Sequence, residues 1–129
     1  MLDTNVISYI IKNRNYSLID KFEEISKNHT LCVSSITVAE LFYSVKKKGS
    51  KKLEVAVNEF LSPLEKLSFD ANAAFAYGEI RVALELKGNI IGAHDMFIAA
   101  HAKSIEAVLV TNNTREFERV DDLKVEDWS

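Results

Sequence analysis

Acidic residues stand at several points where predicted strands give way to helices. Asp3 ends an apolar start, Glu40 lies in the helix after the second strand, and Asp95 opens a later helix. Asn113 and Glu116 follow the strand after that helix. In an open α/β sheet, ligands bind outside the carboxyl ends of the strands. We therefore expect these side chains to meet at one edge of the sheet.

A cluster of carboxylates has predictable chemistry. Like charges held together raise the pKa of at least one member unless a cation neutralises them. Oxygen ligands without a soft cysteine favour Mg²⁺ or Mn²⁺. Such an ion polarises a phosphodiester and lowers the pKa of bound water, so the cluster predicts metal-assisted hydrolysis of phosphodiesters.

Each of these residues also has a purely structural interpretation. Thr37-x-x-Glu40 matches a capping box, in which the Glu40 side chain only reaches back to a backbone N–H. Asp3 and Asp95 can each cap a helix. Glu116 can be a solvated acid on a short helix, and Asn113 can shape a turn. Their joint placement, more than any single position, favours a site.

Alternating strands and helices place these residues in an α/β fold. We expect a three-layer α/β/α domain with a mainly parallel central sheet of about five short strands. The predicted strands end at Asp3 or span 31–33, 64–69, 107–110 and 123–125. The predicted helices span 5–12, 18–25, 36–47, 71–87 and 95–103, with one around Leu53–Leu61 and a helical turn at Glu116–Phe117. Asn13–Asn15 is a predicted turn, Lys46–Lys52 a basic loop, Asp70 an N-cap and Gly88 a C′ glycine.

Composition limits the class of protein. The 129 residues suit one domain spanning 1–129, of which 47% are hydrophobic and 27% charged. We expect no membrane span and no signal peptide, and the single cysteine, Cys32, fits the reducing cytoplasm. A net charge of -3 argues against a general nucleic-acid coat protein. It leaves room for an enzyme that holds nucleic acid through metal ions.

Four segments occur in an order that is more specific than any one of them. They are Leu2-Asp3-Thr4-Asn5, Ser34-Ser35-Ile36-Thr37-Val38-Ala39-Glu40-Leu41, the stretch 91–102 around His94-Asp95-Met96, and Leu109-Val110-Thr111-Asn112-Asn113-Thr114-Arg115-Glu116-Phe117. Together they resemble a PIN-domain ribonuclease. More narrowly, the chain resembles a VapC-type toxin of a bacterial type II toxin–antitoxin system, nearly from end to end.

The resemblance implies a Mg²⁺-dependent endoribonuclease that forms a homodimer and is inhibited by a cognate antitoxin protein. On the family pattern, Asp3, Glu40 and Asp95 correspond to the acidic metal site, and Thr4 to a hydroxyl beside it. Thr111 and Asn113 correspond to the polar residues after the fourth strand. The substrate would be RNA, cut at a place that the sequence does not specify.

Two features depart from the family pattern. Many PIN domains have a fourth acid where this chain has Asn113, so either this amide or Glu116 fills the fourth position. The chain also begins only two residues before Asp3, which makes its first strand unusually short. The first departure leaves the number of metal ions open.

Other polar residues carry weaker signals. The lysines of Lys46–Lys52 can contact RNA or an acidic partner, although such a run is more often a solvated loop. Arg81, Arg115 and Arg119 are candidate contacts of RNA or antitoxin, and Arg115 is favoured because it flanks the Thr111–Glu116 motif. His94 and His101, seven positions apart and without cysteine partners, match no zinc pattern, so we expect packing or surface roles for them. Four aromatic residues are most simply core or interface residues, although an exposed one among them can stack on an unpaired base: Tyr9, Phe42, Tyr43 and Trp128.

Two rival functions remain. A phosphotransfer domain with an aspartate nucleophile would need a second Asp close to Asp3, and Asp3-Thr4-Asn5 lacks it. A non-catalytic PIN-like module that binds RNA or protein would use the acids only as helix caps. Metal binding that depends on Asp3 and Asp95 separates that module from an enzyme.

Overall fold

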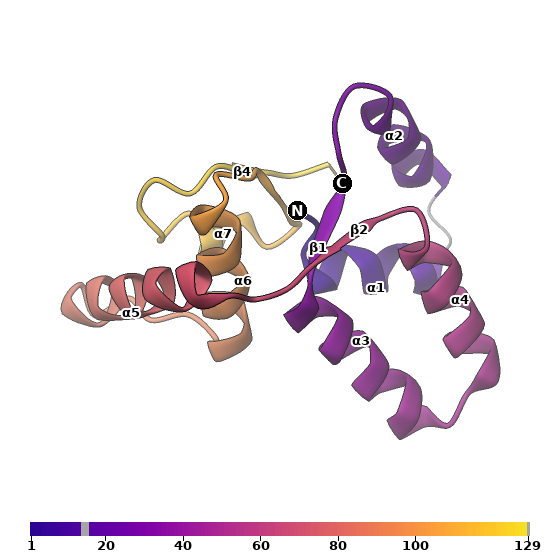
Figure 1. Cartoon of the computed structure of the whole chain (residues 1–129), viewed down its shortest axis with the longest axis horizontal. Helices are drawn as coiled ribbons and strands as arrows, with labels where there is room; N and C mark the ends of the chain where they lie inside the picture. The colour runs from indigo at the N-terminus through magenta and orange to yellow at the C-terminus, as the bar shows by residue number, and fades with distance from the viewer. Residues whose placement is uncertain (14–15, 129) are drawn as a thin grey trace.

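The chain folds into helices that cover two faces of a small sheet (Figure 1). The structure, a computed structural model, describes residues 1–13 and 16–128. Its helices are α1 (Thr4–Asn13), α2 (Tyr16–Ser26), α3 (Ser35–Lys48), α4 (Lys51–Leu61), α5 (Ala71–Leu86), α6 (Ala93–Ser104) and α7 (Thr114–Phe117). Its strands are β1 (Cys32–Ser34), β2 (Glu65–Leu67), β3 (Leu109–Val110) and β4 (Val125–Glu126).

The first three residues join two pairs of strands into one sheet. β1 pairs with β2 and β3 with β4, both in parallel. The Leu2 N–H donates to the Cys32 carbonyl at 2.9 Å, while the Asp3 N–H donates to the Val110 carbonyl at 2.9 Å. The resulting order is β2, β1, the segment Met1–Asp3, β3, β4. The predicted parallel sheet of about five short strands is confirmed, with its first strand reduced to a single bridge between Leu2 and Val110.

Successive side chains of the central segments alternate between two hydrophobic cores. Met1, Cys32 and Leu109 pack into a core with α5, α6 and α7. Their neighbours Leu2 and Val110 pack into a second core with α1 to α4. Apolar side chains on both faces of the sheet give the predicted three-layer α/β/α arrangement. The same packing fixes the carboxyl edge of the sheet, where Asp3 lies.

Local signals set several helix ends as predicted. Asp70 caps α5 by accepting the Ala73 N–H at 3.0 Å, and Gly88 follows that helix with φ +64°. The prediction of a basic loop over Lys46–Lys52 is wrong, because α3 continues to Lys48 and α4 begins at Lys51. Only Gly49, at φ +60°, and the N-cap Ser50 separate the two helices.

Part of the turn predicted at Asn13–Asn15 falls on residues 14 and 15, outside the described residues. Among the helices of residues 1–13 and 16–128, none is long and apolar enough to cross a membrane.

Candidate active site

Asp3 is a buried carboxylate at the carboxyl edge of the sheet. Its residue is 1% exposed, and its Oδ2 accepts a hydrogen bond from Thr111 Oγ1 at 2.9 Å. It also accepts backbone N–H groups of Thr4 and Asn5 at the start of α1. Burial raises the pKa of Asp3 above its usual value, although these hydrogen bonds oppose that rise. Asp3 therefore caps a helix and also faces the other acids.

Glu40 faces the same edge from α3. Thr4 Oγ1 lies 3.1 Å from Glu40 Oε1 and 3.1 Å from Thr37 Oγ1. The capping box predicted for Thr37 and Glu40 is wrong, because Ser34 is the N-cap and accepts the Ile36 N–H. The Glu40 side chain is consequently directed across to α1 rather than back along its own helix.

Asp95 lies in the first turn of α6, and its carboxyl is the most perturbed of the cluster. The helix begins at Ala93 after Gly92, which provides no side-chain cap, so the interpretation of Asp95 as a plain N-cap is wrong. Burial, followed by a hydrogen bond with Glu116 and the charges of Asp3, Glu116 and Glu40, raises the pKa of Asp95 to about 7. Asp95 thus interacts with all three of the other acids.

Asn113 and Glu116 complete the edge from the loop after β3. Asn113 Nδ2 donates to Glu116 Oε2 at 3.1 Å, and the Asn113 N–H donates to Thr111 Oγ1 at 2.9 Å. A chain of hydrogen bonds therefore runs from Asp3 through Thr111 and Asn113 to Glu116. The structure brings together all seven residues predicted for the site: Asp3, Thr4, Glu40, Asp95, Thr111, Asn113 and Glu116.

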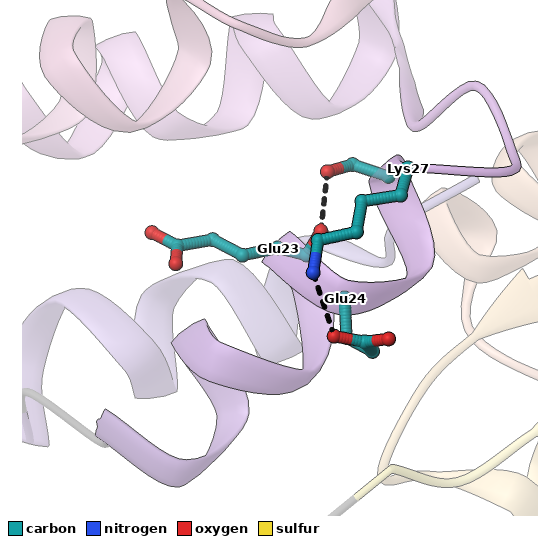
Figure 2. A network of polar contacts seen from close by, with 4 residues as sticks. Glu23, Glu24 and Lys27 are labelled. Carbon is teal, nitrogen blue, oxygen red and sulfur yellow. Dashed lines mark hydrogen bonds and ion pairs between the residues drawn. The ribbon is translucent and has the colours of Figure 1, made fainter.

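In the part of the chain that the structure describes, the clustered acids lack the Lys and Arg partners that several other surface acids have. On α2, Lys27 pairs with Glu24 at 3.1 Å, and Figure 2 shows this exposed network beside Glu23. In the described part of the chain, the four clustered acids form no ion pair with Lys or Arg. Their one ion-pair contact is His94 Nδ1, 3.3 Å from Glu40 Oε2. Among the described residues, no Lys or Arg therefore offsets the charge of these acids through an ion pair.

Comparison with known proteins identifies the fold that presents these acids. The family model described as the PIN domain matches residues 1–123. The chain belongs to the PIN-domain family. It is 45% identical over 129 residues to "Ribonuclease VapC2" of Rickettsia felis, covering 99% of this chain and 96% of that relative. This family membership confirms the predicted resemblance.

Further relatives extend the likeness of this PIN domain to VapC proteins. It is 43% identical over 130 residues to the "tRNA(fMet)-specific endonuclease VapC" of Shigella flexneri, covering 100% of this chain and 97% of the relative. Its structure is similar to VapBC2 from Rickettsia felis bound to a promoter DNA fragment. That match has a TM-score of 0.94 at 43% identity and covers 100% of this chain and 98% of the other.

The donor atoms of the PIN-domain cluster suit a hard divalent cation. Carboxylate, hydroxyl and amide oxygens are the ligands that Mg²⁺ and Mn²⁺ take, and Cys32 lies apart from them, buried in a hydrophobic core. Within residues 1–13 and 16–128, no three Asp, Glu, His or Cys side chains are already grouped around one point. Burial is the main cause of the raised pKa of Asp95, and the charges of Asp3, Glu116 and Glu40 raise it further. A cation placed among these carboxylates would relieve their mutual repulsion. The residues therefore fit such an ion.

Two contacts of the site were not assigned to it from the sequence. Thr37 was interpreted only as a cap, yet it is buried, and its hydroxyl contacts the same Thr4 hydroxyl that contacts Glu40. Its position three residues before Glu40 was the available signal, since that spacing puts both on one helix face. His94 was predicted to have a packing or surface role, and the structure places its Nδ1 3.3 Å from Glu40 Oε2. The other histidine, His101, is buried with Nδ1 2.7 Å from Ser34 Oγ.

The hydroxyl of Thr111 provides a direct test of the buried network. We expect Thr111→Val to lower the free energy of unfolding by about 1–3 kcal/mol, because it removes a partner from both Asp3 and the Asn113 N–H. Urea denaturation measures the change. Thr111→Ser, which keeps the hydroxyl, and the same Thr-to-Val change at the partly exposed Thr114 are the controls. Equal stability of Thr111→Val and wild type would contradict the role of this hydroxyl.

Proposed function

We propose that this PIN domain is a Mg²⁺-dependent endoribonuclease that acts in the cytoplasm as the toxin of a toxin–antitoxin pair. The observation that supports it most is the convergence of four carboxylates, uncompensated by Lys or Arg in the described chain, with the pKa of Asp95 raised to about 7. An acidic cluster that only capped helices would not need its members to face one another. The names of the relatives, which include ribonuclease and endonuclease, support RNA as the substrate.

In the proposed mechanism, Asp3 and Asp95 would hold Mg²⁺ or Mn²⁺, with Glu40 beside them. The ion supplies positive charge at the scissile phosphate and lowers the pKa of water in the site. Thr111 and the first turn of α1 fix the Asp3 carboxylate, and Thr4 fixes that of Glu40. These hydrogen bonds hold the donors in position before RNA arrives, which is how geometry contributes to the rate.

Asn113 and Glu116 have a second role in this mechanism. Their mutual hydrogen bond places an amide and a carboxylate beside Asp95. Glu116 supplies the negative charge that Asn113 lacks at the fourth position. In that place the pair can orient the attacking water and accept its proton while the phosphodiester bond breaks.

The proposed partners follow from the relatives. The similar structures include "VapBC" complexes from Rickettsia felis and from Salmonella typhimurium. We propose a cognate antitoxin as the inhibitor of this chain and a homodimer as its assembly. Sedimentation of the purified protein as a monomer at micromolar concentration would contradict the homodimer.

Cleavage of RNA by the purified protein tests the activity. The Shigella flexneri relative is named for tRNA(fMet), so initiator tRNA is the first substrate, with an elongator tRNA and total cellular RNA alongside. We expect discrete fragments with Mg²⁺ or Mn²⁺ and none with EDTA. Cleavage that persists in EDTA would contradict a metal-dependent reaction. If no RNA is cut and calorimetry detects no Mg²⁺ or Mn²⁺ binding, the non-catalytic module is the better description.

A further inference from the structure

Helix α3 continues beyond the acidic cluster with residues that the proposed chemistry does not use. Tyr43 and Lys47 follow Glu40 by three and seven positions, a spacing that puts all three on one face of the helix. Tyr43 is 64% exposed, and Lys47 is exposed as well. The Lys47 ammonium lies 5.7 Å from the centre of the Tyr43 ring. We call this face, defined by Tyr43 and Lys47, the α3 track.

The α3 track leads from negative to positive charge. Figure 1 shows α3 and α4 as a hairpin that projects from the sheet, with the turn between them at its far end. The exposed lysines of that end are Lys46, Lys47, Lys48, Lys51 and Lys52. Of these, Lys46 pairs with Glu54 at 3.7 Å. This end of the hairpin is therefore cationic, although the whole chain has a net charge of -3.

An exposed aromatic ring beside lysines is suited to an unpaired nucleotide. Bases of single-stranded nucleic acid stack on aromatic side chains, while basic groups along the groove contact the backbone. The ring of Tyr43 offers the stacking surface, and Lys47 offers a cation for an adjacent phosphate. The α3 track also adjoins Glu40, so a strand lying on it would run directly into the acidic cluster.

We infer that the α3 track binds a single-stranded stretch of RNA next to the cleaved bond, with a base stacked on Tyr43 and a phosphate on Lys47. The inference rests on the proposed RNA substrate. It adds a part of the site that selects unpaired RNA, because bases within a duplex are already stacked on one another and do not offer a free face. The cationic end of the hairpin continues the path for the backbone and draws RNA toward the acids.

Binding without cleavage tests this inference separately from catalysis. The probe is a fluorescein-labelled single-stranded oligoribonucleotide of mixed sequence, titrated with protein in EDTA and followed by anisotropy. We expect Tyr43→Ala to weaken binding about tenfold, which is the typical loss of one base–aromatic stack, and Tyr43→Phe to retain it within about twofold. Lys47→Gln should reduce the slope of log Kd against log salt by about 0.7. Tyr16→Ala is the matched control, because Tyr16 is 70% exposed on α2, away from the track.

A crosslinking experiment locates the contact. The same oligonucleotide with 5-iodouridine should crosslink to Tyr43, and the modified peptide is identified by mass spectrometry. Equal binding by Tyr43→Ala and wild type, or no measurable binding by wild type, would overturn the inference. A change in the sedimentation of Tyr43→Ala with unchanged RNA binding would also overturn the inference, because it would show that the α3 track forms a contact between copies of this chain. Tyr43-dependent binding without any cleavage in Mg²⁺ would support the track while contradicting the proposed nuclease.

Discussion

Asp95→Asn should lower the rate of RNA cleavage by at least about 100-fold, and Asp3→Asn should do the same. Loss of residues that merely support metal ligands typically costs 10- to 100-fold in metal affinity or activity, so the ligands themselves should cost no less. Asparagine has nearly the shape of aspartate but no charge, so the change tests the carboxylates with little disturbance of packing. The measurement is the initial rate on initiator tRNA at saturating Mg²⁺.

A matched control separates this effect from general loss of charge. Asp121→Asn also removes one negative charge, but that carboxylate is paired with Lys87 at 2.7 Å on the surface, outside the cluster. We expect Asp121→Asn to cleave RNA at the wild-type rate within about twofold, since exposed ion pairs contribute little. Calorimetry should show weaker Mn²⁺ binding only for the cluster variants. If Asp95→Asn cleaved RNA as fast as Asp121→Asn, the proposed metal site would be wrong.

Local patterns in the sequence predicted the elements that present the site. The continuous apolar run at Ala107–Val110 predicted a strand covered on both faces, and β3 lies inside that run. Asp70 and Gly88 predicted both ends of α5, because a cap involves only residues within one turn of it. Asp3 was placed correctly at the edge of the sheet for the same reason, since it directly follows the apolar start.

The errors arise where two local signals compete or where distant parts of the chain decide. Ser34 and Thr37 both have a hydroxyl that can cap α3, and the pairing of Ser34 with Leu67 in the sheet makes Ser34 the cap. Because Glu40 is not part of a capping box, its carboxylate can accept the hydrogen bond of the Thr4 hydroxyl. These two residues are 36 positions apart, so local sequence spacing does not predict their contact. The start of α6 was predicted at Asp95 and lies at Ala93, because the N-cap residue Gly92 has no side chain that could indicate a cap in the sequence.

Without metal, the carboxyl of Asp95 should make a contribution to stability that is lost as pH rises from about 4 to about 7. The carboxyl of Asp95 has a pKa of about 7 in the folded state against 3.8 for an unperturbed aspartate. Between these values the folded state binds more protons than the unfolded state. Raising the pH therefore favours unfolding, and the effect is complete above about 7. Urea denaturation in EDTA at pH 5 and pH 8 measures it.

The variant Asp95→Asn isolates the contribution of this carboxyl, because other groups titrate over the same range. In EDTA we expect the difference in unfolding free energy between Asp95→Asn and wild type to shift in favour of the variant from pH 5 to pH 8. Mg²⁺ should stabilise wild type at pH 8, by about 2.7 kcal/mol at 100 times its Kd, and have little effect on the variant. Ionised carboxylates both destabilise the metal-free fold and bind the ion, so the two effects should grow together with pH. A difference between variant and wild type that did not change with pH would contradict this account of the cluster.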